Sequence, residues 1–368
     1  FFGVTSMRYK TITLSEVAKR AGVSTTTASM ILSRRAGVSF SKETVEKVES
    51  IARETGYSPS QKHQSKGTAS PTVLIVCPNI SNHYYSRIVQ AIQQEADANH
   101  YSTLVFTHYR DIAKETECVQ MALDLGIKGL VFATMPNNVK LLEDINARIP
   151  VVVIGDRDDH AALDTVEMND YGAGAMLAQH LYSLGHRHIA FISTSLGEHF
   201  AMRQRRLMGL KERLVQKDPT SSVAVFSHAV SPSEELSDID LEYNIGYRLT
   251  TNCLQEKPDV TAFVAVNDSV AAGVMDAIIS RGFRIPEDYS VCGCDNTSTS
   301  RYKFAGITTV EHQLEEKGRY AFHILQKRMK GETSDRIMRV EYPNRLMERK
   351  STGPARKTDP KPDSRRRS

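Results

Sequence analysis

Small hydroxyl-bearing side chains gather on one expected helix near the start of the chain, and their chemistry suits contact with DNA. At about 100° per residue, one side of a helix over residues 25–33 carries Thr25, Thr26, Ser29 and Met30. An exposed helix face usually carries Lys and Glu, whereas small hydroxyl groups allow a close approach to base edges and phosphates. The pattern therefore predicts a recognition helix that lies in the major groove.

The residues before this helix predict a partner helix and a tight turn. Apolar residues recur at the i, i+3, i+4 and i+7 spacing of one buried helix face: Leu14, Val17, Ala18 and Ala21. Gly22 permits a left-handed turn at low steric cost, and the Ser24 hydroxyl can accept a hydrogen bond from a free amide of the next helix. The pair is typical of a helix-turn-helix, although an ordinary helical hairpin in a core has the same pattern.

A third expected helix and a polar linker complete the N-terminal region. Ser41 can cap this helix, and one of its faces holds Val45, Val48 and Ala52. Residues 58–71 are polar, with several Ser, Gln and Lys, which is typical of a linker. We therefore expect the N-terminal region to fold as a small all-α headpiece.

Charge is unevenly distributed along the 368 residues. Residues 8–60 hold nine Lys and Arg against five Glu, and residues 353–368 hold six basic against two acidic residues. Because the whole chain has a net charge of only +4, the region 71–352 between them is acidic. A basic N-terminal module on an acidic body is expected for a DNA-binding headpiece with a separate regulatory body.

From residue 72 onward, short apolar runs alternate with helical patterns. The first series of expected strands covers residues 73–77, 104–106, 130–133 and 151–154. After a helix over 170–184, a second series covers residues 189–192, 224–226, 262–266 and 290–292. Apolar strands that alternate with helices predict parallel sheets covered on both faces. We therefore expect two Rossmann-like α/β lobes, with a ligand cleft at the carboxyl ends of their strands.

Composition and missing motifs exclude several classes of protein. The chain is 40% hydrophobic and 24% charged, and it holds no apolar run of about 18 residues and no secretory apolar segment. Its five cysteines are odd in number and scattered, so we expect a cytoplasmic protein with reduced thiols. Cys292 and Cys294 lie in an apolar run and are expected to be core residues. We expect no metal, no cofactor and no membrane partner, and we expect no enzyme, because no G-x-S-x-G, P-loop or H-E-x-x-H motif is present.

Several motifs carry a resemblance to a known family. In chain order they are Ile12-Thr-Leu-Ser-Glu-Val-Ala-Lys-Arg-Ala-Gly-Val-Ser24, Gly56-Tyr-Ser-Pro59, Ile127-Lys-Gly-Leu-Val131, Gly185-His-x-His188, Arg203-x2-Arg206, Val266-Asn-Asp268, Gly293-x-Asp295 and Thr308-Thr-Val310. Together with the order of the segments, they resemble the lactose/galactose repressor family of bacterial transcription regulators over residues 11–352. The resemblance implies a helix-turn-helix headpiece and a two-lobed body like that of periplasmic binding proteins.

The resemblance also implies a mechanism. A homodimer would place two recognition helices in successive major grooves of a pseudo-palindromic double-stranded operator. A small-molecule effector, often a sugar or nucleoside, would bind between the lobes and change the operator affinity of the headpieces. We expect dimers rather than tetramers, because the C-terminal tail has no leucine heptad. The implied DNA contacts are Thr13, Ser24, Thr25, Thr26, Thr27, Ser29, Met30 and Lys66.

Two charged residues occupy the effector-binding positions that the resemblance implies. The guanidinium of Arg206 offers paired donors to hydroxyls or a carboxylate, and the carboxylate of Asp268 accepts from sugar hydroxyls. The alternatives are a surface arginine at residue 206 and a helix N-cap at residue 268. The further implied contacts are Asn79, Tyr84, Tyr85, Asp156, Leu241 and Asp295. The spacing around Asp156 is one residue out of step with the family, and Leu241 stands where several members carry an aromatic ring.

One other function fits the expected body. A stand-alone solute-binding receptor of the periplasmic type shares the two-lobed fold, but it would carry a signal peptide and no headpiece. We therefore prefer a DNA-binding transcription regulator, with repression as its action. The expected domains are a headpiece over 11–60, a hinge or linker over 61–71, an effector-binding and dimerisation body over 72–352 and a disordered basic tail over 353–368.

The expected hinge generates a prediction about DNA shape. Lys66 stands where the family has a Leu that wedges into the minor groove and kinks the operator. An ammonium group can contact phosphate but is a poor apolar wedge. We predict that this chain bends its operator less than the family usually does and that its binding falls more steeply with salt. A DNA-bending assay and a salt titration measure both quantities, and a full central kink would contradict the prediction.

Overall fold

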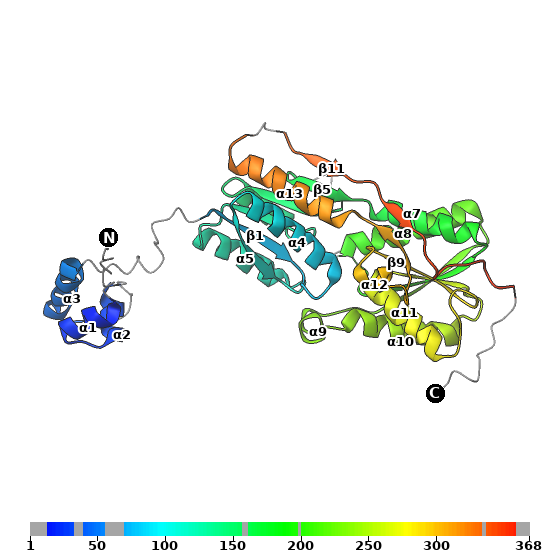
Figure 1. Cartoon of the computed structure of the whole chain (residues 1–368), viewed down its shortest axis with the longest axis horizontal. Helices are drawn as coiled ribbons and strands as arrows, with labels where there is room; N and C mark the ends of the chain where they lie inside the picture. The colour runs from blue at the N-terminus through cyan, green and yellow to red at the C-terminus, as the bar shows by residue number, and fades with distance from the viewer. Residues whose placement is uncertain are drawn as a thin grey trace, which may run out of the picture. The chain divides into compact units, whose positions relative to one another are not determined.

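The computed structural model describes residues 13–32, 40–55, 70–156, 161–197, 200–332 and 336–357. The chain divides into two units, residues 1–69 and residues 70–368 (Figure 1). Lys66, most of the expected hinge and the distal part of the expected basic tail lie outside the described residues.

The headpiece is built from three helices in its described part: α1 (Leu14–Ala21), α2 (Thr25–Leu32) and α3 (Lys42–Thr55). Gly22 ends α1 at φ 71°, and the Ser24 hydroxyl caps α2 by accepting from the amide of Thr27 at 3.0 Å. The buried core of this unit consists of Ala18, Ala21, Ala28, Ile31 and Val48. These observations confirm the predicted turn, cap and apolar faces. Such features can be predicted because each depends only on residues close together in the sequence.

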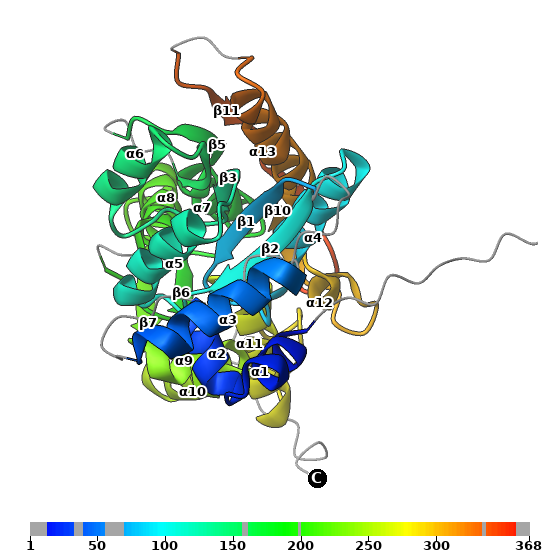
Figure 2. The ribbon, with the colours of Figure 1, turned by 90° about the vertical axis from the view of Figure 1, so that its left-hand side faces the viewer.

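The first lobe of the body contains a six-stranded sheet in the order β11-β5-β4-β3-β1-β2. Its strands are β1 (Thr72–Cys77), β2 (Ser102–Thr107), β3 (Gly129–Phe132), β4 (Val151–Asp156), β5 (Asp164–Met168) and β11 (Arg339–Glu341). One face packs against α4 (His83–Ala98) and α13 (Leu314–Met329), and the other against α5 (Ile112–Asp124) and α6 (Val139–Asn146) (Figure 2). The strands of this sheet pair in parallel, as predicted.

The second lobe contains a six-stranded sheet in the order β12-β10-β9-β8-β6-β7. Its strands are β6 (His188–Ser193), β7 (Ser222–Ser227), β8 (Ala262–Ala265), β9 (Ser290–Cys294), β10 (Thr308–Glu311) and β12 (Arg345–Met347). Its helices are α7 (Asp170–Ser183), α8 (Ala201–Lys217), α9 (Pro232–Ser237), α10 (Leu241–Glu256), α11 (Asp268–Ser280) and α12 (Ser298–Arg301). Within the helical layers, α7 packs against α8 and α10 against α11 (Figure 1).

The C-terminal part of the body departs from the prediction of two successive series. After β10 the chain returns to the first lobe, where α13 packs beside α4 and β11 pairs with β5 (Figure 1). It then enters the second lobe again, and β12 pairs antiparallel with β10. The sheet of the second lobe is therefore mixed rather than purely parallel. The two added strands are three residues long, too short to show a period in the sequence.

The prediction of a disordered tail is wrong for residues 353–357, because these residues pack on the second lobe. The amide of Gly353 donates to the Ser290 hydroxyl at 3.0 Å. The Arg356 guanidinium donates to the carbonyl oxygens of Pro258 at 2.7 Å and Val260 at 2.8 Å. The same guanidinium lies 4.6 Å from the ring centroid of Tyr289, within cation–π range. These contacts stabilise the segment although it lacks large apolar side chains.

Two further observations concern the cysteines and the helices. All five cysteines are buried and free: Cys77, Cys118, Cys253, Cys292 and Cys294. Among the described helices, none is long and apolar enough to cross a membrane.

Two glycines allow α7 and α8 to approach closely. A Cβ atom at Gly174 of α7 would collide with the carbonyl oxygen of Arg206 in α8. A Cβ atom at Gly209 of α8 would collide with the carbonyl oxygen of Tyr171 in α7. The absence of both side chains lets the backbones touch, and this contact fixes where Arg206 lies relative to the start of α7.

This packing predicts an effect opposite to helix propensity. Alanine is the better helix former by about 1 kcal/mol, so propensity alone favours Gly174→Ala. We expect the substitution instead to lower the free energy of unfolding by about 1–3 kcal/mol, because the new methyl group overpacks the helix contact. Denaturant unfolding of the two proteins measures the difference. Equal or higher stability of the variant would contradict the close approach of α7 and α8.

Candidate functional site

A cavity of about 430 Å³ lies between the two lobes of the body. Its walls come largely from segments that directly follow strands: Thr134 after β3, Asp156 at the end of β4, Val266 and Asn267 after β8, Asp295 after β9 and His312 after β10. The carboxyl ends of strands in both sheets therefore meet at one site, as the sequence predicted from the topology of open α/β sheets. Helices α4, α7 and α8 supply most of the other side chains described below, and Arg110 and Phe200 lie outside these helices.

A buried ion pair forms one wall of the cavity. Arg206 of α8 and Asp170, the first residue of α7, are 7% and 2% exposed. The Arg206 Nε donates to Asp170 Oδ1 at 2.9 Å, its Nη2 donates to the same oxygen, and its Nη1 donates to the carbonyl oxygen of Val266. Burial lowers the pKa of Arg206, but the acidic groups around it, led by Asp170, together outweigh burial and the net shift is upward. The surface-arginine alternative for Arg206 is therefore wrong.

Asp156 presents an incompletely bonded carboxylate to the cavity. The residue is 3% exposed, and its Oδ2 has no hydrogen-bond partner among the described residues. The half-buried Arg205 places its Nε 3.6 Å from this oxygen. Burial, followed by the negative charge of Asp170, raises the pKa of Asp156 to about 7. A buried acceptor left without a donor is costly, so a hydroxyl of a bound ligand would be stabilised here.

Aromatic rings form a further wall. Tyr84 and Tyr85 of α4 are both buried, and their ring centroids lie 4.8 Å apart in an edge-to-face arrangement. Phe200, just before α8, lies beneath two guanidinium groups, with Arg203 at 4.9 Å and Arg110 at 5.3 Å from its ring centroid. These residues all line the cavity. They give it apolar faces beside strong hydrogen-bond donors, the combination that suits a ligand with both kinds of surface.

Three of the expected effector contacts lie away from this cavity. Asn79 and Leu241 line a neighbouring cavity of about 240 Å³, where the Asn79 amide donates to Glu235 at 2.6 Å. Asp268 is fully buried, and its carboxylate accepts from the amide of Thr297 and the hydroxyl of Thr309, each at 2.7 Å. Asp268 therefore connects α11 to the segment after β9 and to β10, and it does not line the cavity.

The cavity residues that the sequence did not assign include Asp170, Asn267 and His312. Asn267 is also the N-cap of α11, the role that the sequence offered as an alternative for Asp268. Asn267 belongs to the Val266-Asn-Asp268 motif. The motif therefore marks the correct segment after β8, but Asn267 rather than Asp268 lines the cavity. Asp170 and His312 follow β5 and β10, which the apolar pattern did not predict as strands.

Helix α2 keeps its predicted polar face. Thr25, Thr26 and Ser29 are exposed, and Met30 is half-buried. The Thr13 hydroxyl caps α1 through the Glu16 amide, and the hydroxyls of Ser24 and Thr27 lie 2.8 Å apart at the start of α2. Helix α2 has no acidic residue in its first turn, so the partial positive charge of its N-terminus is available to a phosphate.

Comparison with known proteins agrees with this arrangement. Residues 13–60 match the lacI family of bacterial regulatory proteins, and residues 178–352 match a periplasmic binding protein-like domain. The chain is 31% identical over 353 residues to the HTH-type transcriptional repressor PurR of Erwinia tasmaniensis, which covers 94% of this chain and 98% of the relative.

Solved structures share the fold. A lac repressor dimer bound to operator and the anti-inducer ONPF matches with a TM-score of 0.65 at 24% identity, over 94% of this chain and 100% of the other. A LacI family regulator from Enterococcus faecium with bound ribose matches with a TM-score of 0.67 at 23% identity, over 77% and 100% of the two chains.

The fold and the site define a class of protein, a transcription regulator with a helix-turn-helix headpiece and a two-lobed binding body. Within that class, the chain belongs to the LacI family of bacterial regulatory proteins.

The buried carboxylate of Asp156 predicts a dependence of stability on pH. A carboxyl pKa raised from 3.8 to about 7 stabilises the folded state below the unfolded pKa, and this contribution is lost as pH rises through about 7. We expect Asp156→Asn, which carries no charge, to gain stability relative to the wild type as pH rises from about 5 to about 8.

Thermal unfolding of both proteins across this pH range measures the effect. Asp97→Asn, at an exposed position of α4, serves as the control and should follow the wild type. If the stabilities of Asp156→Asn and the wild type changed in parallel with pH, the raised pKa of a buried Asp156 carboxylate would be contradicted.

Proposed function

We propose that the chain is a transcriptional repressor whose operator affinity is controlled by a small polar metabolite bound between the lobes. A homodimer binds a pseudo-palindromic operator through two copies of α2. The observation that carries the proposal is the presence in one chain of an exposed hydroxyl face on α2 and of a cavity lined by Arg206, Asp170 and Asp156. The headpiece disfavours the alternative, a stand-alone solute receptor, because such a receptor has no use for it.

Helix α2 supports direct contact with the operator. Thr25 and Thr26 lie in its first turn, where helix amides and hydroxyl groups can both bind phosphate. Ser29, one turn further along, can donate to or accept from a base edge. Met30 has no polar atoms for bidentate contact with guanine, so apolar contact with a thymine methyl group is the specificity expected at that position.

The cavity favours a polyhydroxylated ligand of the sugar class. Sugar hydroxyls both donate and accept hydrogen bonds, so they match carboxylate acceptors such as Asp156 and Asp295 beside the guanidinium donors of Arg203 and Arg205. The rings of Tyr84 and Phe200 can cover the apolar face of a sugar. A volume of about 430 Å³ suits a small metabolite. The ribose bound to the Enterococcus faecium regulator supports the same class.

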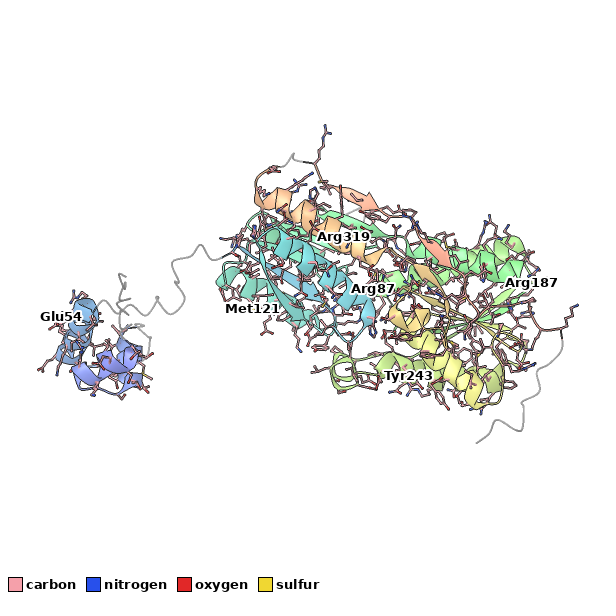
Figure 3. The ribbon with its side chains drawn as sticks, viewed as in Figure 1. Glu54, Arg87, Met121, Arg187, Tyr243 and Arg319 are labelled. Carbon is pink, nitrogen blue, oxygen red and sulfur yellow. The ribbon has the colours of Figure 1, made fainter. Side chains whose placement is uncertain are left out.

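Both lobes contribute residues to this cavity, so a bound ligand can change how the two lobes are positioned relative to each other. Tyr84 and Asp156 come from the first lobe, and Arg206 and Asp295 come from the second. Arg87 of α4 bridges the lobes beside it, since its Nη1 donates to the carbonyl oxygen of Asp295 at 2.9 Å (Figure 3). A ligand that bonds to both lobes stabilises one spacing of the lobes over others and so shifts the population of conformations.

Thermal unfolding against a panel of sugars, sugar phosphates and nucleosides tests the binding role. A ligand at 100 times its dissociation constant should stabilise the full chain by about 2.7 kcal/mol. We expect Asp156→Asn and Arg205→Ala to weaken binding of any hit by about tenfold or more, because each removes a charge-assisted hydrogen bond to a hydroxyl.

The matched control is Arg319→Ala, an arginine on α13 that pairs with Glu316 away from the cavity (Figure 3). It should bind the hit as the wild type does. A hit that stabilises the two cavity variants as much as the wild type would bind elsewhere, and the proposed effector site would then be wrong.

A further inference from the structure

Three buried side chains that can ligate a metal meet at one edge of the cavity. Cys294 ends β9, Asp295 follows it directly, and His312 follows β10, the parallel neighbour of β9. Their ligand atoms all lie within 4.8 Å of one another. The Cys294 Sγ is 3.2 Å from His312 Nε2, and this nitrogen is 3.7 Å from Asp295 Oδ1. A thiol, an imidazole nitrogen and a carboxylate therefore converge on one point.

The bonding around His312 sets which of its ring nitrogens faces the other two ligands. The Asn344 side-chain amide donates to the carbonyl oxygen of Asn169 at 2.6 Å, so its Oδ1 is the atom that faces His312 Nδ1 at 3.0 Å. Nδ1 must then carry the proton and donate. This leaves the lone pair of Nε2 directed at Cys294 and Asp295. Metal-bound histidines are held in the same way by an acceptor at their other nitrogen.

We propose that Cys294, Asp295 and His312 bind a divalent transition metal of the zinc class. Zinc prefers cysteine, histidine and carboxylate ligands in a tetrahedral arrangement. With metal–ligand distances of about 2.0–2.3 Å, tetrahedral geometry places neighbouring ligand atoms about 3.3–3.6 Å apart. The observed separations of 3.2 Å and 3.7 Å lie close to these values, and all three ligand atoms lie within 4.8 Å of one another, so they would need to close only slightly around a metal.

The surrounding charges are compatible with a dication. The carboxylates of Asp170 and Asp268 act on Cys294 together with that of Asp295. Arg206 opposes them, but its guanidinium is already paired with Asp170. Lys317 is the further cation that acts on His312. Because Arg206 and Asp170 offset each other, the carboxylates of Asp268 and Asp295 remain beside the cation Lys317, and they would stabilise a metal ion.

The site has three protein ligands and one open side. Asp295 and His312 line the cavity between the lobes. A zinc site with three protein ligands keeps its fourth position for water or for an atom of a bound molecule. The metal would therefore lie in the wall of the cavity with that position directed inward. The metal site shares Asp295 with the proposed effector site, but its test needs only the metal, so the two proposals can fail separately.

Cobalt substitution of the full chain tests the site with the metal alone as probe. After removal of metals with a chelator, Co²⁺ ligated by a thiolate in tetrahedral geometry absorbs strongly in the near ultraviolet and the visible. We expect one equivalent of Co²⁺ to produce these bands and Zn²⁺ to abolish them by displacement. The Cys294→Ser variant should lose the thiolate band, whereas Cys292→Ser, a buried thiol on the same strand, should keep it.

Two further variants separate ligation from structure. Asn344→Ala leaves the three ligands in place but removes the partner of His312, and we expect it to weaken Zn²⁺ binding about 10–100-fold. His312→Gln should weaken it further than Asn344→Ala does. Far-ultraviolet circular dichroism confirms that each variant is folded. Absence of the cobalt bands in the wild type, or their persistence in Cys294→Ser, would overturn the site and leave the sugar proposal untouched.

Discussion

The buried ion pair between Arg206 and Asp170 is the interaction on which the binding body depends. It joins the first residue of α7 to the second turn of α8 and, through the carbonyl oxygen of Val266, to the end of β8. The two helices approach closely enough for it only because Gly174 and Gly209 have no side chains. Breaking such a pair leaves an uncompensated buried charge, which costs about 3–5 kcal/mol. The pair therefore builds the cavity wall, and its main contribution is structural.

The groups left for recognition differ from those that hold the structure. The carboxylate of Asp268 accepts hydrogen bonds from Thr297 and Thr309, and the guanidinium of Arg206 donates to Asp170. Asp156, by contrast, keeps one oxygen without a hydrogen bond among the described residues. A polar ligand is stabilised mainly by groups of this second kind, because they gain bonds that the empty protein lacks. Selectivity for one sugar over another would then rest on Asp156 and its neighbours.

Local signals could be predicted from the sequence, and long-range pairings could not. The caps at Gly22 and Ser24 depend on residues three or four positions away, and the strands β1 and β6 are long apolar runs. The return of α13 and β11 to the first lobe depends on contacts with β5 and α4, which leave no period in the sequence. The meeting of Cys294 with His312 arises in the same way, because pairing of β9 with β10 joins residues 18 positions apart.

The coupling between the cavity and α2 is tested most directly by measuring it in both directions. The operator affinity of the full chain is compared with and without saturating ligand, and the ligand affinity is compared with and without operator. Thermodynamic linkage requires the two ratios to be equal, and a regulator of this class should show a ratio of about 5–150-fold. Equal ligand affinity for the free and the operator-bound protein would show that the cavity does not control the headpiece.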